Sequence, residues 1–161
     1  MGNELQIIDN DIQELAFANG EQIGFATMRV CGQLFGISVL TVQDVLRSLK
    51  IAHVPLAPDV VAGSINLRGR IVTVIDMRKR LKQKPAEKGA KVIHVVVEYR
   101  DELYSLMVDS VGDVINLPSN RLEQPPSNLG ESWHELSSSV CQLEKELLVV
   151  LDVQALLTFS S

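Results

Sequence analysis

The residues able to do acid–base, nucleophilic or metal chemistry are few in this chain and far apart. His53 lies two residues before Pro55, His94 lies in a strand-like stretch, and His134 follows a tryptophan. Cys31 and Cys141 show no C-x-x-C spacing, and both lie in apolar stretches. Zinc sites and catalytic dyads need side chains that converge, and nothing in these spacings brings them together. We therefore expect no catalytic residue, no metal and no cofactor.

Two aspartates occupy matching positions and invite a paired-carboxylate interpretation. Asp76 and Asp152 each end a run of apolar residues and begin a short stretch with helical spacing. An aspartate at that place accepts a hydrogen bond from a backbone N–H of the first helical turn. We predict that both aspartates cap helices and do no acid–base chemistry.

A basic segment over residues 68–91 is the strongest charge feature of the chain. It carries Arg68, Arg70, Arg78, Lys79, Arg80, Lys82, Lys84, Lys88 and Lys91 against two acidic residues. The chain has four Phe, two Tyr and one Trp, and none lies inside this segment. Proteins that bind single-stranded nucleic acid stack bases on exposed rings. Nucleic-acid binding by residues 68–91 is kept as the alternative, and a patch that meets an acidic protein surface is preferred.

Composition and charge limit the classes that remain. The 161 residues are 46% hydrophobic and 22% charged, which is typical of a soluble globular protein of one domain or two small ones. No apolar run approaches the length of a membrane helix, which is about 20 residues, and no signal peptide is evident. We expect a cytoplasmic protein without direct membrane insertion. Residues 1–22 are acidic and lack Lys and Arg, and we interpret them as a flexible N-terminal arm.

The apolar runs are short and rich in Val and Ile, which predicts strands. We expect strands over residues 25–30, 34–39, 42–46, 71–75, 92–99, 103–108, 111–117, 140–143 and 147–151. Helical spacing predicts short helices over 76–84 and 153–159, and the polar stretch from Pro125 to Ser132 predicts a long loop.

An internal repeat organises these elements. Residues 34–45 align with 103–114 at an offset of 69, and residues 67–81 align with 143–157 at an offset of 76. The halves, approximately 23–91 and 92–161, would each hold about five short strands. Each half is too small to bury much surface alone. We predict an all-β fold of two small five-stranded OB/SH3-like barrels that share a core and carry short helices.

Matching valines in the two halves leave two interpretations open. The residues are Val39, Val42 and Val45 in the first half and Val108, Val111 and Val114 in the second. All six are suited to a core. If two barrels pack side by side, the same positions line a groove that suits an amphipathic helix.

Residues 63–78 resemble the signature of the CheW family of chemotaxis coupling proteins. The family hallmark is an N-L-R-G turn, a β-branched strand and D-hydrophobic-R, found here from Asn66 to Arg78. The F-G-I and V-x-D-V segments at 35–45, Pro58, and V-D-x-V-x-D-V at 108–114 are similar to the family as well. Thr73 stands where the family usually has proline, and Ser139, Cys141 and Glu144 stand where glycine is common, so the conformation of residues 130–146 is left open.

The resemblance implies two five-stranded barrels that exchange segments around a common core. It also implies a non-catalytic adaptor that links the cytoplasmic tips of chemoreceptors, the methyl-accepting chemotaxis proteins, to the regulatory domain of the histidine kinase CheA. Such a protein is cytoplasmic and associates with receptor arrays, with weak self-association in the array. Nucleic acid is not an expected partner under this resemblance.

The resemblance assigns candidate residues to two surfaces. Receptor binding falls, by motif position, to Val39, Val42, Asp44, Arg68, Val108 and Val111. The division between a basic first half and an acidic second half adds a candidate surface for kinase binding or self-association, formed by Arg78, Lys79, Arg80 and Lys82.

Overall fold

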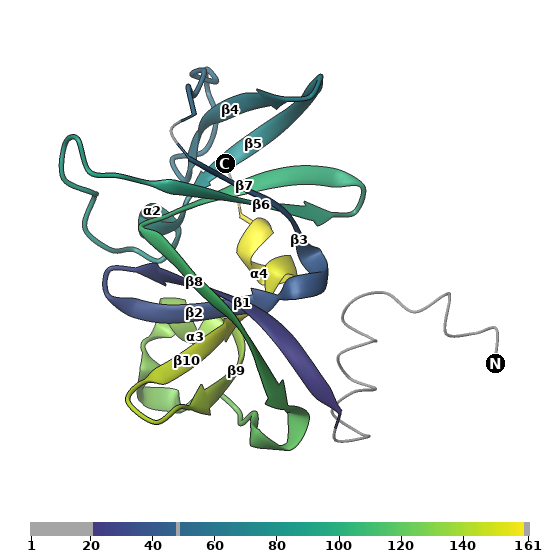
Figure 1. Cartoon of the computed structure of the whole chain (residues 1–161). Coiled ribbons are helices and arrows are strands. Elements are labelled where there is room, and N and C mark those ends of the chain that lie inside the picture. Colours follow the sequence, from purple (N-terminus) through teal and green to yellow (C-terminus); the bar gives the residue numbers. More distant parts are fainter. Residues whose placement is uncertain (1–20, 48, 160–161) are drawn as a thin grey trace.

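The computed structural model describes residues 21–47 and 49–159 (Figure 1). Most of the predicted acidic arm, residues 1–20, lies outside the described residues. Its last residue, Gln22, begins the first strand and so belongs to the folded part.

The described part contains ten strands and three short α-helices. The strands are β1 Gln22–Val30, β2 Gln33–Ser38, β3 Val42–Arg47, β4 Val61–Leu67, β5 Arg70–Asp76, β6 Ile93–Tyr99, β7 Glu102–Val108, β8 Ser110–Pro118, β9 Ser137–Gln142 and β10 Leu147–Leu151. The helices are α2 Met77–Arg80, α3 Glu131–Leu136 and α4 Val153–Leu157, with 3₁₀ turns η2 Val39–Thr41, η3 Ser119–Arg121 and η4 Ser127–Leu129. The prediction of an all-β protein with short helices is confirmed.

The strands form two five-stranded sheets. Sheet A has the order β8-β1-β2-β10-β9 and sheet B has the order β3-β6-β7-β5-β4. Sheet A forms the lower half of the molecule in Figure 1 and sheet B the upper half. Neighbouring strands are antiparallel except for one parallel pair in each sheet, β2 with β10 and β5 with β7.

The registers of the two sheets show that the internal repeat is structural. Phe35 pairs with Val149 in sheet A, and Tyr104 pairs with Thr73 in sheet B. These pairs are related by the offsets of 69 and 76 found in the sequence. The offset of 69 alone relates the antiparallel pairs of β1 with β8 to those of β6 with β3. The two sheets are therefore two copies of one strand arrangement.

Each half of the chain contributes strands to both sheets. Sheet A takes β1 and β2 from the first half and β8, β9 and β10 from the second, while sheet B takes the other five. The chain crosses from sheet A to sheet B between β2 and β3, and it crosses back between β7 and β8 (Figure 1). Neither half can complete a sheet without the other.

The edge strands of each sheet are joined at a single point in the described residues. Ala52, which follows β3, bridges to Ser64 in β4, and Glu123, which follows β8, bridges to Val140 in β9. In each sheet the segment that follows one edge strand is thus joined to the other edge strand by one bridge and not by a continuous ladder.

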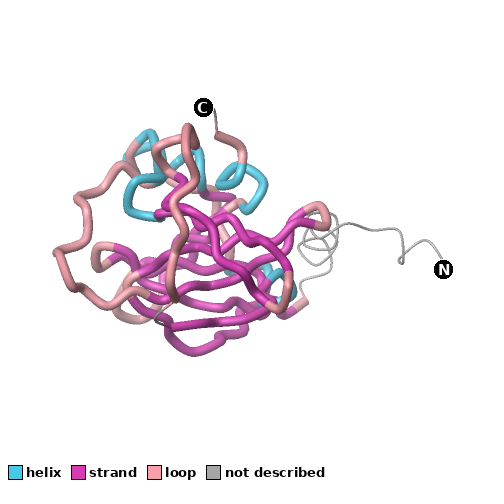
Figure 2. The backbone as a smooth tube through the Cα atoms, turned by 90° about the horizontal axis from the view of Figure 1, so that it is seen from above, coloured by secondary structure: helices cyan, strands magenta, loops and turns pink. Residues whose placement is uncertain are grey.

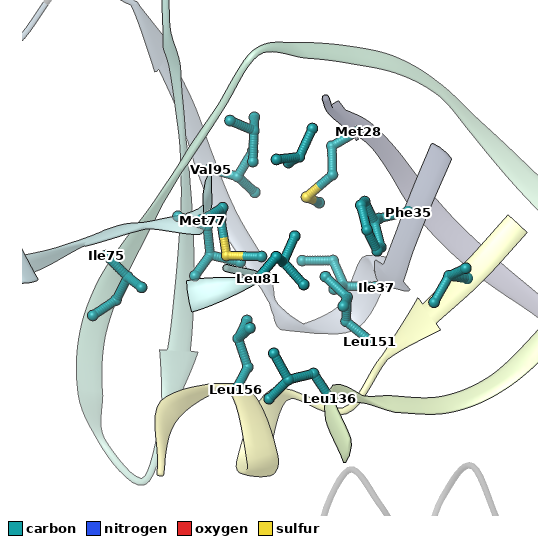
Figure 3. Packing of buried hydrophobic residues seen from close by; sticks show 14 of the residues in the cluster. Met28, Phe35, Ile37, Ile75, Met77, Leu81, Val95, Leu136, Leu151 and Leu156 are labelled. Atoms are coloured by element: carbon teal, nitrogen blue, oxygen red, sulfur yellow. The ribbon is translucent and has the colours of Figure 1, made fainter. Parts of the chain in front are cut away.

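The largest hydrophobic cluster lies between the sheets and draws on both. Met28, Phe35 and Ile37 come from sheet A, and Ile75 and Val95 come from sheet B; all are at most 1% exposed (Figure 3). Leu81, Leu136 and Leu156 close the cluster from the helical segments. Most helical segments lie along one side of the strands, near the C-terminus (Figure 2). Burial of this shared apolar surface holds the two sheets together.

The structure corrects three predictions about elements. Strand β4 was not predicted, because Gly63, at a register shift and with φ of +151°, interrupts the apolar pattern. Helix α3 lies where a loop was expected to end. The helix predicted over 76–84 stops at Arg80, since Lys82 takes a left-handed φ of 57°.

Candidate functional site

The N-L-R-G motif is the turn between β4 and β5. Arg68 and Gly69 have φ of 53° and 84°, the pattern of a type I′ hairpin turn. Asn66 stabilises the turn, because its side-chain oxygen accepts a hydrogen bond from the Gly69 N–H at 3.0 Å. The turn presents the Arg68 side chain at the hairpin tip, where it is 80% exposed.

Arg68 forms an ion pair with Asp44 of β3. The Arg68 Nη2 and Asp44 Oδ2 atoms lie 3.4 Å apart. The other carboxylate oxygen of Asp44 accepts the Val45 N–H at 2.8 Å. The structure thus brings together two residues assigned to the receptor side that are distant in sequence. An exposed pair of this length contributes about 0–1 kcal/mol, so its geometry exchanges readily.

Val39 and Val42 lie at the crossover from sheet A to sheet B. Ser38 caps the 3₁₀ turn η2 that begins this crossover, accepting the Leu40 N–H at 3.3 Å on its side chain. Val39 is 37% exposed and Leu40 is 65% exposed, whereas Val42 packs partly buried against the central core. The turn therefore carries apolar side chains on its outer face.

Val108 and Val111 lie at the opposite crossover, from sheet B to sheet A. Val108 ends β7 and is only 1% exposed, so it belongs to the core. Val111 is partly buried and pairs with Met28, near the end of β1. Val39 lies against Gly24, near the start of β1, so the two crossovers are separated by about 13 Å along that strand. The six receptor-side residues therefore fall in two separate places.

Two exposed valines lie outside the predicted receptor set. Val45 on β3 and Val114 on β8 are equivalent under the repeat and are 43% and 54% exposed. Both lie on edge strands, and each follows a register shift in its sheet. Val45 and Val114 are the last residues of the two V-x-D-V motifs. The motif alone does not show whether its first or its last valine is the more buried.

A surface hollow of about 290 Å³ lies beside Val111 on sheet A. Leu34, Ile115 and Leu143 supply apolar lining, and Arg29 lies among the polar residues around it. Val111 thus faces a small mixed pocket in addition to the central core.

Arg78 of the basic segment is held by an internal ion pair. Its Nε and Nη2 atoms donate to the two oxygens of Asp109 at 3.0 and 2.8 Å. Asp109 also accepts the Cys31 N–H at 2.8 Å. The hydrogen bonds to Asp109 raise the pKa of Arg78 above its ordinary value. Arg78 therefore connects α2 to the second crossover and to the β1–β2 turn.

Arg80 is occupied by the end of helix α4. It donates hydrogen bonds to the carbonyl oxygens of Leu156 at 2.8 Å, Ala155 at 2.9 Å and Thr158 at 3.0 Å. Its guanidinium lies 5.9 Å from the centroid of the Phe159 ring. Burial lowers the pKa of Arg80. Cations that bind the last carbonyls of a helix act as its cap.

Within the candidate kinase or self-association surface, the exposed residues are Lys79 and Lys82. Lys79 pairs loosely with Asp59, with 3.4 Å between Nζ and Oδ1. The candidate kinase or self-association surface therefore divides into two internal arginines and two exposed lysines.

A family model for the CheW-like domain matches residues 24–160 of the chain. The chain belongs to the CheW-like domain family. The match covers every described strand except the first two residues of β1.

Individual CheW proteins agree with this assignment. The chain is 30% identical to the chemotaxis protein CheW of Bacillus subtilis, across 80% of this chain and 82% of that protein. It is 26% identical to the chemotaxis protein CheW of Klebsiella aerogenes, across 86% of this chain and 85% of that protein. The crystal structure of the scaffolding protein TtCheW from Thermoanaerobacter tengcongensis superposes with a TM-score of 0.75 at 25% identity, covering 81% of this chain and 88% of that chain. The function of this CheW-like chain is that of a chemotaxis coupling adaptor, and nothing in these matches favours the nucleic-acid alternative.

The histidine and aspartates considered for acid–base chemistry have structural roles in this CheW-like fold. His94 is fully buried, its Nδ1 lies 2.9 Å from the Ser105 hydroxyl, and burial lowers its pKa. Asp76 and Asp152 cap α2 and α4 as predicted, each accepting an N–H at 3.2 Å. Among the described residues no group of three or more His, Cys, Asp or Glu is arranged to hold a metal. No helix in residues 21–47 and 49–159 is long and apolar enough to cross a membrane.

Proposed function

We propose that this adaptor links the cytoplasmic tips of chemoreceptors to the histidine kinase CheA, and that it does so in the cytoplasm without catalysing a reaction. The receptor surface in this proposal consists of η2, the outer side of β3 and the tip of the β4–β5 hairpin. The observation that carries it is the Arg68–Asp44 pair, which lies beside the exposed apolar residue Val45.

This surface has the chemistry that an amphipathic helix requires. Val39, Leu40 and Val45 offer exposed apolar contacts. Arg68 supplies a planar fork of donors that can bind a carboxylate or the carbonyls at a helix end. Because its pair with Asp44 is long and exposed, Arg68 can move to a partner at small cost in free energy.

In our proposal Val108 and Val111 contribute separately, from the second crossover. Val108 is buried, so it acts by fixing the path of the chain between the sheets. Val111 lines the hollow on sheet A, where a second partner helix or loop would meet it. Truncation of Val108 is then expected to act through the fold rather than through a lost contact.

The kinase regulatory domain and neighbouring copies in an array would meet the ends of the sheets. Of the four candidate residues for this contact, Lys79 and Lys82 are exposed. Arg78 and Arg80 hold the surrounding elements in position. Residues 92–161 carry eleven acidic and three basic residues, which favours weak head-to-tail self-association with the basic segment of another copy.

A titration separates the adaptor from the nucleic-acid alternative. A labelled receptor hairpin and a labelled single-stranded oligonucleotide are each titrated with the full chain, first in dilute buffer and then at about 150 mM salt. We expect hairpin binding that persists in salt. Oligonucleotide binding that exceeds hairpin binding at the higher salt concentration would overturn the adaptor proposal.

A further inference from the structure

An exposed apolar surface lies beside the point where the described chain begins. Leu40 is 65% exposed, Val45 is 43% exposed, and Val39 is 37% exposed. These side chains come from η2 and from the neighbouring strand β3. We refer to Val39, Leu40 and Val45 as the crossover patch.

The start of β1 lies next to Val39 of this patch. The Glu21 carbonyl accepts the Ser119 N–H at 2.9 Å, which fixes the first described residue at the end of β8. Three residues later, a Cβ on Gly24 would stand 3.1 Å from Val39 Cγ1. Glu21, the first described residue, is three residues from Gly24 and so lies within roughly 10 Å of the residue that contacts Val39.

Residues 1–20 have a sequence suited to such a surface. Leu5, Ile8, Ile12 and Leu15 recur at intervals of three, four and three residues. This spacing aligns apolar side chains along one face of a helix. A 20-residue helix is about 30 Å long, which exceeds the length of a six-residue strand such as β3, about 20 Å.

The charges of the two partners are complementary. Residues 1–20 carry four acidic residues and no Lys or Arg. Arg47 is exposed on the same side of β3 as Val45, and Arg68 is exposed at the hairpin tip. An acidic amphipathic segment of this chain therefore matches an apolar patch flanked by arginines.

We propose that residues 1–20 fold back in cis over the crossover patch and cover it. Where the patch is the receptor surface, which rests on the proposed function, the arm competes with the receptor helix and weakens its apparent binding. The arm then acts as an internal mimic of an amphipathic partner helix. A population closed in 80–90% of molecules lowers apparent receptor affinity about five- to tenfold.

The docking step is tested first, in the full chain and without any receptor. Ile8→Asp with Ile12→Asp breaks the apolar stripe, and Ile7→Asp is a matched control because residue 7 lies off that stripe. We expect the double variant to shift the NMR methyl resonances of Val39, Leu40 and Val45, and we expect Ile7→Asp to leave them in place. Unchanged resonances in the double variant would overturn the proposal.

Dilution distinguishes the arm of the same molecule from that of a second copy. Docking in cis leaves the methyl resonances of the unmodified chain unchanged on a roughly tenfold dilution. Resonances that move toward those of the double variant on dilution would show docking between copies and overturn the cis proposal.

Receptor binding then tests the competition separately from the proposed function. The double variant is expected to bind a receptor hairpin about five- to tenfold more tightly than Ile7→Asp. Equal affinities together with shifted methyl resonances would overturn the competition. If the hairpin binds no form of the chain, the proposed function fails, while the methyl shifts still decide whether the arm docks.

Discussion

Arg78 donates hydrogen bonds of 3.0 and 2.8 Å to the two carboxylate oxygens of Asp109, and this contact joins parts of both sheets. Arg78 belongs to α2, which follows β5 of sheet B, and Asp109 lies where the chain crosses into sheet A. Asp109 also binds the N–H of Cys31, at the turn between β1 and β2. Two motifs noted separately in the sequence, D-x-R and V-D-x-V, therefore meet in one contact.

Asp109→Asn tests how much this contact stabilises the fold. The asparagine can still accept the Cys31 N–H, but it loses the charge that Arg78 needs. Because both side chains are less than a third exposed, we expect a loss of about 1–2 kcal/mol in the free energy of unfolding. Urea unfolding measures this loss, with Asp59→Asn as control because Asp59 is 87% exposed in a pair of 3.4 Å. Equal losses in the two variants would contradict the prediction.

The sequence predicted the duplicated arrangement more closely than it predicted single contacts. The offsets of 69 and 76 predicted which strands are equivalent, and the registers observed in the two sheets agree with these offsets. Helix capping by Asp76 and Asp152 followed from local spacing. Helix capping can be predicted from the sequence because it depends only on residues that are close together in the chain.

The contacts that the sequence did not reveal join residues far apart in the chain. Arg80 was counted among exposed charges, yet it binds carbonyls 75 to 78 residues away. Val108 was assigned to a binding surface, yet its side chain is buried. The charge and hydrophobicity of a residue do not show which way its side chain points. The sequence alone therefore could not separate Arg78 and Arg80, which bond within the fold, from the exposed lysines.

Arg68→Glu tests the proposed receptor surface. The reversed charge faces Asp44 and cannot bind a carboxylate or helix carbonyls of a partner. We expect receptor hairpin affinity to fall at least about tenfold and kinase stimulation in a reconstituted array to be lost. Unfolding in urea should change by less than about 0.5 kcal/mol, since the pair is exposed.

Arg70→Glu is the matched control for Arg68→Glu. Arg70 lies two residues away in the same hairpin, is exposed, and donates to the Asp101 carbonyl at 3.2 Å. Retention of full kinase stimulation by Arg68→Glu, or an equal loss in Arg70→Glu, would argue against a specific role for Arg68.

Val45→Asp and Val114→Asp compare the two equivalent edge strands. Both valines are exposed and occupy matching positions under the repeat, so the two substitutions perturb the fold similarly. If the receptor uses β3, Val45→Asp lowers hairpin affinity about tenfold and Val114→Asp leaves it unchanged. Isothermal titration calorimetry with one receptor hairpin measures both. A larger effect from Val114→Asp would move the receptor surface to β8.

Arg80→Met tests the clamp on the C-terminal helix. Methionine keeps much of the apolar stem but cannot donate to the carbonyls of residues 155, 156 and 158. We expect faster amide hydrogen exchange in α4 and a loss of about 1–2 kcal/mol in unfolding free energy. Lys82→Met serves as control because Lys82 is exposed. Unchanged exchange in α4 of Arg80→Met would show that the helix is held by its apolar packing alone.

The buried His94 gives the fold a pH dependence with a definite sign. Burial lowers its pKa in the folded protein below the ordinary 6.5, so the unfolded chain takes up a proton first as the pH falls. The contribution of His94 to the free energy of unfolding is therefore constant above about pH 7. Below that pH it decreases, by at most about 1.4 kcal/mol per pH unit. Position 94 corresponds to Phe25 under the repeat. The double variant His94→Phe, Ser105→Ala is therefore expected to fold and to lose this pH dependence.

Urea unfolding between about pH 5 and 8 measures the pH dependence of the unfolding free energy. His53→Gln is the control, because His53 is exposed and the variant keeps His94. A double variant whose stability depends on pH as strongly as that of the control would exclude His94 as the source.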